Sequence, residues 1–278
     1  QRFLNGGVQV GNDVEVNTAS ESYAAWNWYM ETTGSGTSNT DGTINTTATL
    51  VDTNIGLSIS QFTGTGSNAT IGHGLGVVPQ MYWVKGIDAG DHWYVYHANN
   101  TAAPQTDALL LNGTGATFDD ATLWNDTAPT SSVISLGSNT GINQSSKKYL
   151  AMAFAPSQFT SIGSYKSNAN ANGPFVPTIN SLGIPIQPAW VMVKDTSGAS
   201  QWWIWDNQRS PFNLSTKVLY PNLSNAESTS VNISIDMVEG GFKLRTSSNP
   251  NGSSGNTYIY LAFGTPIIDV DGRIITGR

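Results

Sequence analysis

The sequence predicts an all-β protein made of tandem β-sandwich domains of a jelly-roll-like kind. Two observations carry this prediction. Short runs of alternating apolar and polar residues are separated by clusters of Gly, Asn, Ser and Thr, which is the pattern of strands joined by turns. Several of these runs also recur after a constant interval along the chain, and no convincing helical periodicity accompanies them. Many short strands without helices favour sandwiches.

The interval between the recurring runs is 109 residues. It separates residues 79 and 188, 93 and 202, and 149 and 258, which begin three matched pairs of segments. An interval of this length indicates a duplicated small domain, because solenoid units are only about 20–50 residues long. The matched segments are Pro79–Lys85 with Pro188–Lys194, Trp93–Tyr96 with Trp202–Trp205, and Tyr149–Phe154 with Tyr258–Phe263.

The repeat sets the predicted domain organisation. Residues 56–158 and 159–266 are two β-sandwich repeats, called copy 1 and copy 2 below. Residues 31–55 are rich in Gly, Ser and Thr and are predicted to form a flexible or extended linker. Residues 1–30 are predicted to be the C-terminal remnant of an upstream repeat, and residues 267–278 a C-terminal hairpin tail.

The remnant is predicted from a weaker match. Val8–Gly11 followed by Tyr23–Trp28 parallels Val133–Gly137 followed by Tyr149–Phe154. Either a missing N-terminal segment completes this copy, or the fragment pairs with a neighbour.

The strands follow from period-two alternation between turn clusters. In copy 1, alternation begins at Leu57, and further strands are expected at Met81–Lys85, Trp93–His97, Ala108–Leu111, Val133–Leu136 and Tyr149–Phe154. In copy 2 they are expected at Trp190–Lys194, Gln201–Trp205, Ser230–Asp236, Phe242–Arg245 and Thr257–Phe263. The tail hairpin would turn at Asp271-Gly272. One helical turn is expected near Asn225–Glu227.

Composition excludes several classes of protein. The formal net charge of −7 argues against a nucleic-acid partner, which requires a basic surface. No apolar run approaches the roughly 18 residues that span a bilayer, so no membrane insertion is expected. The absence of Cys excludes a disulfide framework and Cys-based zinc sites. No cofactor is expected.

The distinctive string Ile71–Pro79, with its alternating glycines, is interpreted as a structural turn that enters a buried strand. The chain has three histidines. His92 and His97 are five residues apart, so on one strand they face opposite ways, and no metal site is expected.

Enzyme activity is the weaker hypothesis. A glycosidase needs two facing carboxyl groups, yet no acidic position is shared by the two copies. Asp206 aligns with His97, and Glu227 aligns with Phe118. There is also no G-x-S-x-G nucleophile motif and no Cys nucleophile. No catalytic residue is predicted.

The aromatic runs supply the candidate contact residues. In Trp202–Trp205, Trp203 and Trp205 share one face of the predicted strand, and Tyr94 and Tyr96 hold the equivalent places in copy 1. If this face is exposed, these four rings could bind a glycan or anchor a protein interface. The alternative is that both faces are covered, because large aromatic residues are mostly buried.

Several strings resemble one family of proteins. They are Ile71–Pro79 with the strand that follows, Trp124–Val133, Asn172–Phe175, Pro188–Lys194, Asn225–Glu227 and Gly241–Thr246. They resemble repeat-containing tail-fibre or fibre-like virion proteins of bacteriophages that infect cyanobacteria and other aquatic bacteria. The resemblance covers about Gly6 to Phe263. It implies a structural component on the outside of the virion and no catalytic residues.

The expected function is therefore that of a tail-fibre or host-attachment protein. We expect it to associate with other virion proteins and with itself as a symmetric homo-oligomer, with a trimer favoured. Its ligand would be a host-surface glycan or outer-membrane component. The alternatives are a capsid decoration or head-fibre protein and, third, a polysaccharide depolymerase carried on the fibre.

Overall fold

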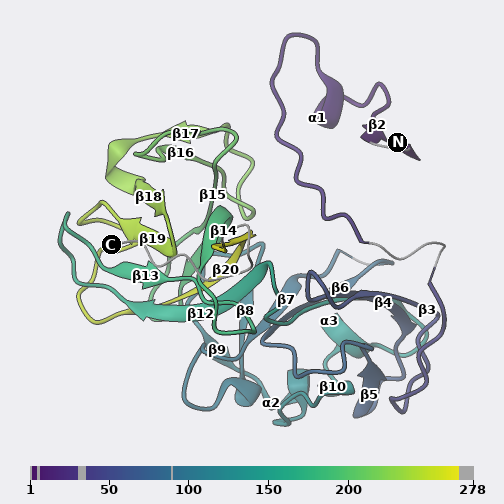
Figure 1. Ribbon diagram of the computed structural model, residues 1–278. Helices are drawn as coiled ribbons and strands as arrows, with labels where there is room; N and C mark the ends of the chain where they lie inside the picture. Colours follow the sequence, from purple (N-terminus) through teal and green to yellow (C-terminus); the bar gives the residue numbers. More distant parts are fainter. Residues whose placement is uncertain (1, 5–6, 31–35, 89, 269–278) are drawn as a thin grey trace. The chain divides into compact units, whose positions relative to one another are not determined.

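The computed structural model of the chain describes residues 2–4, 7–30, 36–88 and 90–268 (Figure 1). The chain divides into two compact units, residues 1–30 and 31–278. The first unit, called the N-terminal segment below, contains a two-stranded sheet and one short helix. Its elements are β1 (Arg2–Leu4), β2 (Gly7–Gln9) and α1 (Val14–Asn17).

Copy 1, extended by strand β3 from the residues that precede it, consists of a large sheet covered on one face by a small one. The large sheet has seven strands in the order β3-β4-β11-β6-β7-β8-β9, and the small sheet is the pair β10-β5. The strands are β3 (Ala48–Asp52), β4 (Leu57–Thr63), β5 (Ala69–Gly72), β6 (Met81–Gly86), β7 (Trp93–His97), β8 (Asp107–Leu110), β9 (Phe118–Asp119), β10 (Val133–Leu136) and β11 (Lys148–Phe154). Three short helical elements lie between them: η1 (Pro104–Thr106), α2 (Ala121–Trp124) and α3 (Thr140–Asn143).

Copy 2 has the same plan. Its large sheet has the order β12-β20-β14-β15, and a three-stranded sheet β13-β19-β18 and the pair β16-β17 accompany it. The elements are β12 (Thr160–Lys166), β13 (Phe175–Pro177), β14 (Ile186–Asp195), β15 (Trp202–Asp206), β16 (Lys217–Val218), β17 (Ser228–Thr229), η2 (Val231–Ile233), β18 (Ile235–Val238), β19 (Gly241–Leu244) and β20 (Thr257–Pro266). The all-β sandwich-type fold expected from the sequence is confirmed. Among the described residues, no helix is long and apolar enough to cross a membrane.

The duplication extends to the pairing of individual residues. The order β4-β11-β6-β7 in copy 1 matches β12-β20-β14-β15 in copy 2. Val84 faces Tyr94 between β6 and β7, and Val193 faces Trp203 between β14 and β15. Both residues of the second pair lie 109 positions after those of the first. Because a register slip would turn every side chain to the other face, the two large sheets present equivalent faces.

Each copy has its own hydrophobic core between the large sheet and its cover. In copy 1, Phe62, Tyr82 and Tyr149 of the large sheet pack with Trp124 of α2 and Ile134 of β10. The corresponding core of copy 2 contains Val193, Trp203, Trp205, Tyr258 and Phe242.

The opposite faces of the two large sheets meet one another. Phe154 of copy 1 contacts Phe263 of copy 2, with ring centroids 6.3 Å apart. Trp83 extends this contact on one side, 4.7 Å from Phe154, and Trp190 on the other, 5.6 Å from Phe263. The Trp202 indole donates to the Leu110 carbonyl at 2.9 Å. We call this surface the seam, and it covers part of the second face of each sheet.

Most of the predicted strands are confirmed, and three expectations are wrong. Ser230–Asp236 is interrupted by η2, because the Ser230 hydroxyl accepts a hydrogen bond from Asn232 N–H and caps a 3-10 turn. Asn225–Glu227 forms no helical turn. The predicted tail hairpin spans residues 267–278. Its residues after Ile268 lie outside the described part of the chain.

The third wrong expectation is a linker that extends through residue 55. Ala48–Asp52 forms the outer strand β3, in which Thr49 pairs with Ser60 of β4. The hydroxyl of Thr49 hydrogen-bonds those of Thr46 and Ser60 at 2.8 and 3.0 Å. The Thr and Ser hydroxyl groups therefore hydrogen-bond one another at this edge of the sheet.

Candidate functional site

The structure buries three of the four predicted contact residues and half-buries the fourth. Tyr96 stacks on Tyr82 in the core of copy 1, with centroids 4.5 Å apart. Trp203 and Trp205 lie in the core of copy 2, and the Trp205 indole donates to the Ile233 carbonyl at 3.1 Å. Tyr94 is half-buried and packs on the core of copy 1. Receptor contact by Tyr96, Trp203 and Trp205 is therefore wrong, because these rings point toward the small sheets, and the seam covers the opposite face.

His97 lies at the seam and is fully buried. Its Nε2 atom is 3.2 Å from the Tyr260 carbonyl of copy 2, and its Nδ1 atom accepts a hydrogen bond from Asn99 N–H at 3.1 Å. Because Nδ1 is an acceptor, Nε2 carries the proton and donates across the seam. Burial lowers the pKa of His97 to about 4, so the ring is neutral near pH 7.

The acidic residues weighed for a depolymerase belong to an ion-pair network. Arg209 Nε is 2.6 Å from Asp206 Oδ2, and Arg209 NH1 is 3.0 Å from Glu227 Oε2. Asp206 also accepts hydrogen bonds from the backbone N–H groups of Gln208 and Arg209. The guanidinium therefore separates the two carboxylates and neutralises part of their charge. Within the described residues, no group of three or more His, Asp or Glu side chains could hold a metal ion.

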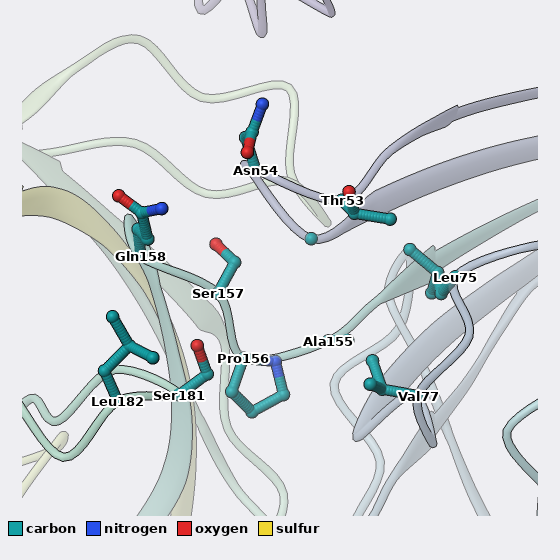
Figure 2. Close-up of a pocket in the computed structure, with 11 residues that line it drawn as sticks. Thr53, Asn54, Leu75, Val77, Ala155, Pro156, Ser157, Gln158, Ser181 and Leu182 are labelled. Carbon is teal, nitrogen blue, oxygen red and sulfur yellow. The ribbon is translucent and has the colours of Figure 1, made fainter.

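An uncharged groove lies where copy 1 passes into copy 2. It consists of two adjoining hollows of about 230 and 400 Å³, which share Val77, Pro156 and Ser181. Figure 2 shows Pro156 between Val77 on one side and Ser181 and Leu182 on the other. No lining residue carries a charge. The other lining residues are Thr53, Asn54, Gly56, Leu75, Val78, Gln80, Ala155, Ser157, Gln158, Ile162, Ile179 and Asn180.

Hydrogen bonds fix the floor of the groove. Ala155 N–H donates to the Gly56 carbonyl at 2.8 Å, and Ser181 N–H donates to the Ser157 carbonyl at 3.1 Å. The buried Asn180 side chain holds its own loop through the N–H groups of Leu182 and Ile184. It also donates to the Gln158 carbonyl at 3.1 Å. The groove is therefore preformed.

The rim of the groove is apolar and exposed. Val77, Val78, Ile179 and Leu182 are each at least two-fifths exposed. Two similar turns supply part of this rim, because both Leu75-Gly76 and Leu182-Gly183 place the glycine at positive φ. Exposed apolar side chains around a hollow are typical of interaction sites.

The groove was missed from the sequence. Within Ile71–Pro79, Ile71 and Gly72 end strand β5 and the predicted turn begins only after them. The exposure of Val77 and Val78 is not visible in the string. The Leu-Gly pair repeated before Pro79 and before Pro188 is the one signal that could have marked both turns.

The sequence of the chain matches a family whose function is unknown. A family described as "Domain of unknown function (DUF7483)" matches residues 1–266. No curated protein and no solved structure matches the chain.

Proposed function

We propose that this chain, which belongs to the DUF7483 family, is an external structural protein of a bacteriophage particle and acts in a tail fibre that attaches to the host. The resemblance of its repeat motifs to fibre-like virion proteins supports this assignment.

The seam is the observation that carries the proposal. Two sandwiches joined through Trp83, Phe154, Trp190 and Phe263 form one body rather than two domains that move independently. A fibre must transmit force and hold its tips in place, and a large apolar interface between domains suppresses their relative motion. The ion pairs with Arg209 give Asp206 and Glu227 a structural role.

The groove is the surface we assign to attachment. It offers apolar rims together with amide and hydroxyl groups, which suit a neutral ligand such as a glycan or an outer-membrane component. A symmetric homo-oligomer, with a trimer favoured, would present several grooves at once and raise the overall affinity. This surface replaces the buried aromatic residues as the candidate contact site.

Labelling of purified virions with antibody to this chain tests the location. Gold particles on the tail fibres are the expected result. Labelling of the capsid would support the alternative of a decoration or head-fibre protein. Absence of the chain from washed particles would refute both assignments.

A pair of matched variants tests the groove. Leu182→Asp places a charge on the rim, where Leu182 is 65% exposed, and Val231→Asp places one elsewhere, where Val231 is 63% exposed. We expect phage carrying Leu182→Asp to adsorb to host cells at least about tenfold more slowly. This corresponds to an increase of about 1.4 kcal/mol in the activation free energy of adsorption. Phage carrying Val231→Asp should adsorb normally. Equal adsorption by both variants would remove the groove from attachment.

A further inference from the structure

The N-terminal segment reproduces part of copy 1 at a constant offset of 126 residues. Helix α1, Val14–Asn17, corresponds residue for residue to α3, Thr140–Asn143. The N-cap is Asp13 in the first and Asn139 in the second, and each side chain accepts a hydrogen bond from the backbone two residues on. Strand β2 likewise corresponds to the first three residues of β10.

The hydrogen bonds of one tyrosine repeat at the same offset. In copy 1, the Tyr149 hydroxyl accepts from Gln144 N–H and donates to the Thr140 carbonyl. In the N-terminal segment, the Tyr23 hydroxyl accepts from Thr18 N–H at 2.9 Å and donates to the Val14 carbonyl at 3.1 Å. Thr18 and Val14 therefore lie 126 residues before the two partners of Tyr149, and the Tyr23 hydroxyl also lies 3.1 Å from Glu21 Oε2.

A buried asparagine shows what the segment requires from a partner. The Asn143 side chain donates to the carbonyls of Gly137 and Ser67 and accepts from Thr65 N–H. In copy 2, Asn251 holds the loop after β12 in the same way, through the N–H of Asn168 and the carbonyl of Asn170. We call this arrangement the asparagine clamp.

Asn17 occupies the clamp position in the N-terminal segment. Its side chain donates to the Gly11 carbonyl at 2.6 Å, which is the counterpart of the bond from Asn143 to Gly137. In the described part of the chain, the two bonds to a loop have no counterpart at Asn17. The clamp is thus prepared on one side only.

The apolar side chains of the segment are exposed where their counterparts are buried. Val8, Val10 and Tyr23 are 41%, 43% and 47% exposed. Their counterparts Ile134, Leu136 and Tyr149 are at most 1% exposed and lie in the core of copy 1. The equivalent of β11 is Tyr23–Trp28, which is not a strand among the described residues. In copy 1, β11 pairs with β4 on one edge and β6 on the other.

We propose that residues 7–28 are a binding surface for the first part of a further repeat, a polypeptide segment equivalent to Leu57–Gly86. That partner supplies a β4-type strand and a β6-type strand to the two edges of Tyr23–Trp28. Its loop, equivalent to Thr65–Ser67, closes the asparagine clamp on Asn17. This inference goes beyond the attachment function and does not depend on it.

Another copy of this chain is not the partner, because both of its β6-type strands, β6 and β14, are already paired on both edges. Strand β4 lies between β3 and β11, and β6 lies between β11 and β7. In copy 2, β12 is bound to β20, and β14 lies between β20 and β15. Strand β12 has one open edge, but supplying a β6-type strand from β6 or β14 would require a folded sandwich to open.

A fusion tests the proposal with the chain's own sequence as the probe. Residues 36–132 are placed directly before Gly7 of the full chain, in the register in which Ser132 precedes Val133 in copy 1. Hydrogen exchange is then followed at the amides of residues 18–28. We expect their exchange to slow by about 100-fold relative to the parent chain, because stable strand pairing protects amides.

The asparagine clamp supplies a matched pair of variants for this experiment. Asn17→Ala in the fused chain should reverse most of the added protection, whereas Asn27→Ala, outside the clamp, should not. Unchanged exchange at residues 18–28 in the fused chain would overturn the proposal, since the same added residues fold in copy 1. Protection that grows with the concentration of the unfused chain would also overturn it, because a second copy would then be the partner.

Discussion

Phe154 and Phe263 hold equivalent positions in the two copies, 109 residues apart, and their rings contact one another across the seam with centroids 6.3 Å apart and planes at 64°. Each ring belongs to an inner strand of its sheet, β11 or β20. The duplicated domain therefore uses the same position in both copies to join them.

The first prediction concerns this contact. Phe154→Ala should lower the free energy of unfolding by about 3–5 kcal/mol, because Phe154 is fully buried and its loss leaves a cavity at the seam. Urea unfolding followed by tryptophan fluorescence measures the change. The matched change Phe212→Ala, at a side chain 84% exposed, should cost less than about 0.5 kcal/mol. A similar small loss for Phe154→Ala would show that the seam contributes little.

The second prediction concerns pH. Burial lowers the pKa of His97 to about 4 in the folded chain, against about 6.5 in an unfolded one. As the pH falls, His97 is therefore protonated in the unfolded chain before it is protonated in the folded chain. The contribution of His97 to the free energy of unfolding is complete above about pH 6.5. It is lost progressively toward pH 4, by up to about 3 kcal/mol.

The matched variants are His97→Gln and His92→Gln, since His92 is exposed. Stability measured from pH 4 to 7 should vary less steeply in His97→Gln than in the parent and should be unchanged in slope in His92→Gln. Burial also lowers the pKa of His73, so some acid dependence will remain. Equal slopes in all three proteins would contradict the assigned role of His97.

The third prediction separates the buried and exposed parts of the ion-pair network. Arg209→Ala removes the guanidinium from the buried Asp206 carboxylate. The change should lower the free energy of unfolding by about 3–5 kcal/mol. Glu227→Gln should cost less than about 1 kcal/mol, because the Glu227 side chain is one-third exposed. Denaturant unfolding compares the two. Equal costs would mean that the network does not depend on Asp206.

The fourth prediction compares two glycines at the groove. Gly56 has φ +67°, and a Cβ there would lie 2.1 Å from the Ala155 carbonyl oxygen. Gly76 has φ +72°, but no atom lies within 4 Å of such a Cβ. Gly76→Ala should therefore cost only the left-handed strain of about 1–2 kcal/mol. Gly56→Ala should cost clearly more in thermal unfolding, and a smaller cost than that of Gly76→Ala would contradict the packing of the groove floor.

The strand positions could be predicted because each copy checks the other. Trp93–His97 and Val133–Leu136 are strands with the predicted bounds, and the register of Val84 with Tyr94 recurs at Val193 with Trp203. The run Trp202–Trp205 also indicates two covered faces, because it is apolar on both. What covers the second face could not be predicted, since the partner strands lie in the other copy and no local pattern specifies that contact.

The groove depends on tertiary context in the same way. Leu75 and Leu182 stand in similar Leu-Gly turns, yet Leu75 is buried and Leu182 is exposed. The linker prediction failed for a related reason, because Thr46, Thr49 and Ser60 satisfy one another through hydroxyl contacts that composition does not reveal.

Differential scanning calorimetry of the chain tests the central claim, that the seam joins the two copies into one body. The account predicts a single transition in which the calorimetric and van't Hoff enthalpies agree, and a single transition at lower temperature in Phe154→Ala. Two separate transitions in the unaltered chain, one for each copy, would contradict it.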